Sequence, residues 1–294
     1  MRVLATRRLP GAAWDELGDV ELGLPSTARP DVDALIVANE PVDLDLFPSL
    51  RLVANFGVGY DRLDLEACRA RDVAVTNTPG VLDAATADLA LGLMLAVRRR
   101  LVEGDDLVRA GAWETAWSAG PFLGREVSGA TLGIVGLGRI GSAVAQRAAA
   151  FEMRVLHHRS TPSADPGYRD LDDLLRESDI VSLHVPLTRQ TTGLLSRERL
   201  ALLREGATLV NTARGAVVDE AALVDELVSG RINAGLDVFV HEPHVPEALR
   251  RLPNVVLTPH IASATIETRS AMTRIVVDNV LAFARGEPLP NRVV

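Results

Sequence analysis

The chain has 294 residues, 47% of them hydrophobic and 24% charged, which is an ordinary globular balance with enough length for two domains. Its net charge of −8 disfavours nucleic-acid and anionic-membrane partners, and no apolar run is long enough to span a membrane. The single cysteine, Cys68, excludes an intramolecular disulfide and a cysteine-rich metal centre, and the absence of lysine excludes a Schiff-base lysine and a lysine-bearing phosphate loop.

The first part of the chain alternates short apolar runs with helical patterns. Residues 1–6 predict a strand rather than a signal peptide, because they lack a long apolar stretch and a small-residue cleavage site, so we expect a cytoplasmic protein. Further strands are predicted at 33–38, 50–55 and 73–77. Leu89, Leu93 and Val97 then recur at helical spacing in a long apolar helix over residues 84–100.

A second α/β series begins at Thr131. Strands are predicted at 132–135, 154–158, 179–184, 208–212, 234–238 and 255–257, and helices at 142–151, 171–177, 220–229 and 265–285. Strands separated by helices at this spacing indicate parallel sheets. Two series with different motifs predict two domains, with the boundary inside the long helix that precedes the second series.

A glycine-rich turn follows the first strand of the second series and opens its first helix. In Gly136-Leu137-Gly138-Arg139-Ile140-Gly141, the three glycines permit a tight turn, close approach of the backbone to a pyrophosphate, and close packing of helix on strand. The helix N-terminus adds unpaired N–H groups and the positive end of the helix dipole. A purely structural glycine turn is the alternative, but the strand-turn-helix context favours a dinucleotide site.

The end of the next strand indicates which dinucleotide binds. An acidic residue there would bind the ribose 2′-hydroxyl of NAD, but the strand runs into Arg159-Ser160 and no acid is present. A guanidinium beside a hydroxyl suits a 2′-phosphate. We therefore predict that NADP(H) is preferred, with NAD(H) possible, against the alternative that Arg159 is only a solvated arginine.

Three loops that follow predicted strands carry Arg214, Glu242 and His260. Ligands gather at the carboxyl ends of parallel strands, so these loops could meet in one cleft. A histidinium can protonate a carbonyl oxygen as hydride arrives, a carboxylate can orient that imidazole, and an arginine can grip a substrate carboxylate. Each residue alone would more simply be structural, but together they predict reduction of a 2-oxo acid.

Several segments resemble the D-isomer-specific 2-hydroxyacid dehydrogenase family, in the family's order and over nearly the whole chain. They are Asn55-Phe56-Gly57-Val58-Gly59-Tyr60-Asp61, Asn77-Thr78-Pro79-Gly80-Val81, Ala85-Thr86-Ala87-Asp88, the glycine turn, His184-Val185-Pro186-Leu187-Thr188 and the three loops above. The resemblance implies an α/β fold with two Rossmann-like, doubly wound parallel-sheet domains. A flavodoxin-like substrate domain would span residues 1–95 plus 272–294, and a dinucleotide-binding domain would span residues 96–271.

The resemblance also implies roles for matching positions. His260 would be the catalytic acid/base, paired with Glu242 rather than Asp237, and Arg214 would bind substrate. Val58 and Gly59 would hold the substrate carboxylate through their backbone amides. The cofactor would be bound by Gly136, Gly138, Arg139, Ile140, Gly141, Arg159, Ser160, Val185, Pro186, Thr212 and Asp237. No metal site is expected.

Within the family, Arg159-Ser160 resembles the NADPH-dependent glyoxylate and hydroxypyruvate reductases. The implied function is reduction of a small 2-oxo acid to a D-2-hydroxy acid. A catalytically weak, cofactor-sensing corepressor or scaffold of the same fold is the alternative, and it is disfavoured because Arg214, Glu242 and His260 are all present. Oxidation of formate or phosphite is a third possibility, which the short N-terminal region disfavours.

Family dimers place an aromatic side chain in the partner's active site, and Phe122 in Gly120-Pro121-Phe122-Leu123-Gly124 is the candidate in an expected homodimer. An aromatic buried in the dimer contact is the alternative. Glu40 follows a strand that should face the substrate, so its charge would disfavour dicarboxylate or phosphorylated substrates, unless it is only a solvated loop charge.

Overall fold

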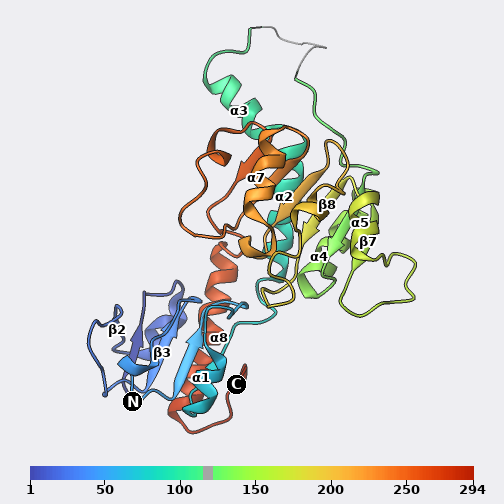
Figure 1. Ribbon diagram of the computed structural model, residues 1–294. Helices are drawn as coiled ribbons and strands as arrows, with labels where there is room; N and C mark the ends of the chain where they lie inside the picture. Colours follow the sequence, from blue (N-terminus) through green and yellow to red (C-terminus); the bar gives the residue numbers. More distant parts are fainter. Residues whose placement is uncertain (115–121) are drawn as a thin grey trace. The chain divides into compact units, whose positions relative to one another are not determined.

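The computed structural model describes residues 1–114 and 122–294 and divides the chain into two compact units. The first unit consists of Met1–Leu82 and Ser263–Val294, and the second of Asp83–Ala262. Figure 1 shows each unit as a sheet flanked by helices. Within the described residues, no helix is both long and apolar enough to cross a membrane.

The first unit is built on one parallel sheet of order β2-β1-β3-β4-β5, the strand order of flavodoxin-like folds. Its elements are β1 (Val3–Ala5), the 3₁₀ turn η1 (Ala12–Leu17), β2 (Glu21–Leu22), β3 (Ala34–Val37), η2 (Leu44–Leu46), β4 (Leu52–Asn55), α1 (Leu65–Ala70), β5 (Ala74–Thr76) and α8 (Ile266–Ala284). Asp64 caps α1 and Thr265 caps α8, each by accepting a backbone N–H bond from the helix's first turn.

Both faces of this sheet are buried, because successive strand residues point to opposite sides. Leu35 and Val53 pack in one core with Cys68 of α1. Ala34 and Leu52 pack in the other core, with α8. The segment after α8 returns to the sheet, where Val293 N donates to Val75 O at 2.7 Å and Val75 N donates to Val294 O at 3.1 Å.

The second unit contains a parallel sheet of order β11-β10-β9-β8-β6-β7. Its strands are β6 (Thr131–Val135), β7 (Arg154–His158), β8 (Ile180–Leu183), β9 (Thr208–Asn211), β10 (Asn233–Leu236) and β11 (Val255–Leu257). Its helices are α2 (Asp83–Arg98), α3 (Leu101–Arg109), α4 (Arg139–Ala149), α5 (Leu171–Glu177), α6 (Arg197–Leu200) and α7 (Glu220–Val228), with 3₁₀ turns η3 (Gly215–Val217) and η4 (Leu249–Arg251).

The strand order reverses at β6, because β7 lies on one side of it and β8 on the other. Helices α2 and α4 cover one face of the sheet, where Leu93 and Val144 share a core with Leu132. Helices α5 and α7 contribute to the core of the opposite face (Figure 1). Ligands of doubly wound sheets bind outside the strand carboxyl ends at such a reversal, so the loops after β6 and β8 are the expected site.

The structure differs from the sequence expectation at the limits of the units and in two helices. The units divide after Leu82 and after Ala262, whereas the expected limits were 95 and 271; α2 packs against α4 and β10 and so lies in the second unit. Helix α4 begins at Arg139, directly after the glycine turn, rather than at residue 142. Helix α3 was not predicted, and none of its residues is buried.

Candidate active site

The glycine turn brings the loop after β6 against the loop after β8. Gly136 has a φ angle of +99°, and a Cβ atom there would lie 2.6 Å from the carbonyl oxygen of His184. A Cβ atom on Gly141 would lie 2.2 Å from the carbonyl oxygen of Gly136. Only glycine fits at these two positions without displacing backbone, so they form the tight turn and the close contact of helix with strand.

Gly138, in contrast, borders open space. No heavy atom of the described residues lies within 4 Å of the position that its Cβ would take. The first internal bond of α4 runs from Ser142 N to Gly138 O at 2.9 Å, so the amides of Arg139, Ile140 and Gly141 are not used inside the helix. Open backbone beside unpaired helix amides fits the pyrophosphate of a dinucleotide.

The loops after β8 and β9 carry the next predicted cofactor residues, Val185, Pro186 and Thr212. Val185 lies beside the glycine turn, its Cγ1 being 2.8 Å from the position that a Cβ of Gly136 would take. Thr212 is 8% exposed, and its hydroxyl has no hydrogen-bond partner within the described residues. A buried hydroxyl without a partner is costly, so Thr212 fits a bound polar ligand.

Arg159 and Ser160 are exposed directly after β7. No hydrogen bond or ion pair of the Arg159 guanidinium is found among residues 1–114 and 122–294. Burial lowers the pKa of the neighbouring His157, and the positive charge of Arg159 lowers it further despite the opposing effect of Asp165. Arg159 is therefore a solvent-exposed cation, without a bonded partner in the described part of the chain, at the end of the second strand of this sheet unit.

Glu242 and His260 form a hydrogen-bonded pair. His260 Nδ1 lies 2.8 Å from Glu242 Oε2, while Glu242 Oε1 accepts a bond from Phe239 N at 3.0 Å. Burial opposes ionisation of Glu242, but the hydrogen bond and charge of His260, the Phe239 amide and the charge of Arg214 together lower its pKa. An ionised Glu242 fixes Nδ1 as the protonated nitrogen and leaves Nε2 available for a substrate.

The loop that carries His260 is fastened to Asp237, just after β10. Asp237 is fully buried, and its carboxylate accepts bonds from the Thr258 hydroxyl at 2.6 Å, Ile261 N at 2.8 Å and Ala262 N at 2.9 Å. Burial raises the pKa of Asp237, although these bonds oppose the rise. Its predicted contact with the cofactor remains a prediction, whereas its observed contacts are with the histidine loop.

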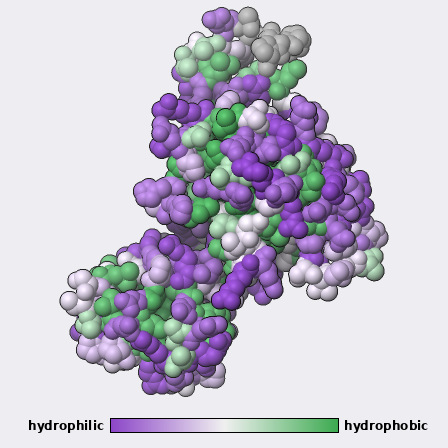
Figure 2. Space-filling model, in the orientation of Figure 1, coloured by the Kyte–Doolittle hydropathy of each residue, from purple (hydrophilic) through white to green (hydrophobic). Residues whose placement is uncertain are grey.

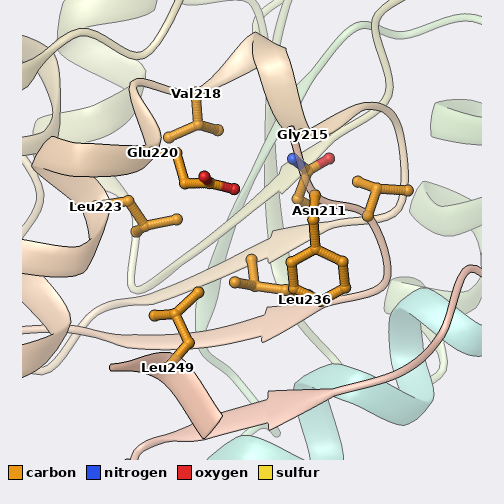
Figure 3. A pocket seen from close by; sticks show the side chains of 9 residues that line it. Asn211, Gly215, Val218, Glu220, Leu223, Leu236 and Leu249 are labelled. Carbon is orange, nitrogen blue, oxygen red and sulfur yellow. The ribbon is translucent and has the colours of Figure 1, made fainter. Parts of the chain in front are cut away.

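Arg214 lies in the turn between β9 and η3. The carboxamide of Asn211, at the end of β9, accepts from Ala213 N at 3.0 Å and donates to Arg214 O at 2.9 Å. A Cβ atom on Gly215 would lie 2.1 Å from the carbonyl carbon of Phe239, so this turn packs directly on the segment that leads to Glu242. Asn211 and Gly215 are among the residues that line a small hollow, most of whose lining side chains are apolar (Figure 3).

The predicted carboxylate-binding loop belongs to the first unit. Val58 and Gly59 are partly exposed after β4, and the side chains of Asn55 and Asn77 bond to the carbonyl groups of their loop. These asparagines belong to motifs of the sequence, but no role was predicted for them or for Asn211. The sequence feature that could have indicated these residues is an asparagine at the end of a strand, directly before a turn.

Two minor predictions have mixed outcomes. Glu40 is not a solitary charge, because it is paired with Arg7 and accepts a bond from Ala38 N, so it is a weaker barrier to anions than expected. Phe122 is 40% exposed and lies under the Arg100 guanidinium, 4.2 Å from the ring centroid. Gly120 and Pro121 of its motif lie outside the described residues.

No cluster of three or more potential metal ligands occurs in the described part of the chain.

Known proteins resemble this chain in sequence and structure. The family model "D-isomer specific 2-hydroxyacid dehydrogenase, NAD binding domain" matches residues 91–262. A glyoxylate reductase of Pyrococcus horikoshii is 50% identical over 277 residues, covering 90% of this chain and 83% of that protein. A Thermus thermophilus protein superposes with a TM-score of 0.93 at 47% identity, covering 100% of both chains. An NADPH-dependent glyoxylate/hydroxypyruvate reductase from Sinorhizobium meliloti, in complex with NADP and malonate, has a TM-score of 0.89 at 38% identity, covering 100% of this chain and 96% of that one.

Proposed function

This chain belongs to the D-isomer-specific 2-hydroxyacid dehydrogenase family of NAD(P)-dependent oxidoreductases, and we propose that it reduces glyoxylate, hydroxypyruvate or a similar small 2-oxo acid with NADPH. The observation that carries this proposal is the Glu242–His260 pair, with its 2.8 Å hydrogen bond, in the unit that also holds Arg214 and the glycine turn. A proton donor and a carboxylate-binding cation are the two groups that carbonyl reduction of a 2-oxo acid needs.

The roles follow from the chemistry of each group. Arg214 binds the substrate carboxylate and polarises the neighbouring carbonyl, and the amides of Val58 and Gly59 also bind the carboxylate. His260 donates the proton on Nε2 to the carbonyl oxygen as that oxygen gains negative charge. Glu242 holds the imidazole in orientation and stabilises its cationic form. The bound nicotinamide supplies the hydride.

Replacement of His260 tests this function. In His260→Ala, NADPH oxidation by glyoxylate or hydroxypyruvate should fall by about 10²- to 10⁴-fold, which is the usual contribution of a positioned general acid. His244→Ala is a matched control, because His244 is exposed on the loop beyond Glu242 and no bond of its side chain occurs in the described part of the chain. Unchanged turnover in His260→Ala would remove His260 from the mechanism.

The preference for NADPH is supported by the unpaired guanidinium of Arg159 beside Ser160, and by the absence of an acid at the end of β7. Arg159→Asp should raise the KM for NADPH by about tenfold or more and should leave the KM for NADH nearly unchanged, because only NADPH carries the 2′-phosphate. Arg250→Asp, at an exposed arginine of η4, makes the same change in net charge. An equal effect of Arg159→Asp on both cofactors would contradict the assignment.

A homodimer is supported by apolar side chains that the second unit leaves exposed. Hydrophobic side chains are uncovered on α3 and in the segments after it, at Leu101, Val102, Val108, Trp113, Phe122 and Leu123. Figure 2 shows green atoms in the region where Figure 1 draws α3. Clustered exposed apolar residues mark protein–protein contacts, so we assign this α3 surface to a second copy of the chain.

A further inference from the structure

Asn55 lies at the junction of two loops that follow neighbouring strands. It is the last residue of β4 and is fully buried. Its Oδ1 accepts from Asn39 N, in the loop after β3, at 2.7 Å. Its Nδ2 donates to Gly57 O at 3.1 Å and to Gly59 O at 2.8 Å. A single carboxamide thus uses both of its polar atoms to connect the loop after β3 with the loop after β4.

The carbonyl group of Val58, which lies between those of Gly57 and Gly59, also accepts a hydrogen bond. Asn77 Nδ2, from the segment after β5, donates to Val58 O at 3.0 Å. The carbonyl of Gly57 accepts a second bond, from Thr78 N, at 3.0 Å. Three successive carbonyl groups, of Gly57, Val58 and Gly59, are therefore bound by side-chain or backbone donors of the first unit.

The direction of these carbonyls fixes the direction of the amides. In a trans peptide the C=O and the following N–H point opposite ways, so the amides of Val58, Gly59 and Tyr60 point away from the asparagines. None of these amides has an acceptor among the residues that the structure describes. Val58 and Gly59 are partly exposed, and successive outward amides of this kind are suited to bind an anion.

We propose that Asn55 is a positioning residue that turns the amides of Val58 and Gly59 toward the substrate carboxylate. The proposal rests on the proposed function, which supplies the anion as a 2-oxo acid. Asn55 does not touch the substrate; it acts through the carbonyls of Gly57 and Gly59. Loss of its two donated bonds would let these peptides rotate, and the carboxylate would lose donors while the dinucleotide site in the second unit keeps all of its own residues.

Asn55→Asp tests the proposal, because it keeps the shape and the acceptor for Asn39 N but sets a carboxylate against two carbonyl oxygens. We expect the Kd of oxamate, measured by calorimetry on the NADPH-saturated enzyme, and the KM for glyoxylate to rise by about tenfold or more. The Kd of NADPH should stay at the wild-type value. Asn254→Asp is the matched control, because its Nδ2 also donates to two backbone carbonyls, at 3.0 and 2.8 Å, before the amino end of β11.

Asn77→Asp provides a second variant, since it breaks the bond to Val58 O from a different segment and should show the same selective loss of oxamate binding. Loss of oxamate and NADPH binding in equal measure in both variants would mean that the asparagines only support folding, and would overturn the proposal. An active Asn55→Asp enzyme with wild-type oxamate affinity would also overturn it. A wild-type protein that reduces neither glyoxylate, hydroxypyruvate nor another small 2-oxo acid would instead overturn the proposed function, and the Asn55 assignment with it.

Discussion

The backbone of His260 adopts a conformation that non-glycine residues rarely take. Its φ angle is +54°, in the left-handed region, which costs about 1–3 kcal/mol for such a residue. Bonds from His260 N to Asp237 O at 2.9 Å and to Thr258 O at 3.1 Å hold the strained turn. The imidazole thus takes its direction from a fixed backbone as well as from Glu242, which suits a proton donor that must meet one atom of a substrate.

The lowered pKa of Glu242 makes a prediction about pH dependence. A carboxyl with a pKa below 4.5 stays ionised across the whole range in which an imidazole titrates, so His260 always faces an anion. Glu242→Gln removes this charge and weakens the acceptor that orients the Nδ1–H group of His260. The kcat/KM for glyoxylate reduction should therefore fall by about tenfold or more at every pH at which Glu242 is ionised.

The pH–rate profile of Glu242→Gln is best compared with that of Glu220→Gln. Glu220 also accepts a backbone bond in this region, from Val240 N at 3.1 Å, but its carboxylate does not contact His260. Identical profiles for the wild-type and Glu242→Gln enzymes would show that Glu242 does not stabilise the catalytic cation.

At the level of elements, one device recurs at three strand ends. A buried Asn or Asp ends or follows the strand, and its short side chain bonds to the loop beyond: Asn55 ends β4, Asn211 ends β9, and Asp237 directly follows β10. Such side chains readily mimic a backbone turn. These bonds therefore hold the loops that carry the candidate binding and catalytic groups in fixed positions relative to the strands.

The glycine turn gives a prediction at the same scale, because its glycines do different work. Gly138→Ala should melt like the wild type, because its methyl group would enter open space. It should bind NADPH and NADH about tenfold or more weakly, because the pyrophosphate is expected to occupy the same space. Gly141→Ala should lower the melting temperature by several degrees, because its methyl group would overlap the Gly136 carbonyl, at a cost of about 1–3 kcal/mol. Thermal melts and cofactor titrations of both variants check this, and equal melting temperatures would contradict it.

For the whole molecule, the α3 surface predicts the oligomeric state. Val108→Glu places a charge among the exposed apolar side chains and should convert the dimer to a monomer in analytical ultracentrifugation. Val228→Glu is the control, because Val228 ends α7 and is 58% exposed, close to the 57% of Val108. A wild-type monomer, or a Val108→Glu dimer of unchanged stability, would remove this surface from the interface.

Local chemistry alone determined much of the fold and part of the site. The periods of apolar residues located most strands and helices, and β7, α5 and β11 begin and end where they were predicted. The glycine turn was recognisable because its function depends on three positions within six residues. Arg214, Glu242 and His260 could be named because each follows a predicted strand, and parallel strands end at one edge.

Only the tertiary structure decided which side chains meet. The Glu242–His260 pair spans 18 residues, the Asn55–Asn39 bond 16 and the Arg7–Glu40 pair 33, so none lies within a helical turn or a β-turn. Tertiary packing also left α3 uncovered and placed all of α2 in the second unit. Periodicity and turn preferences act over a few residues, whereas these contacts depend on which strand ends become neighbours, and that is fixed only when the whole sheet is assembled.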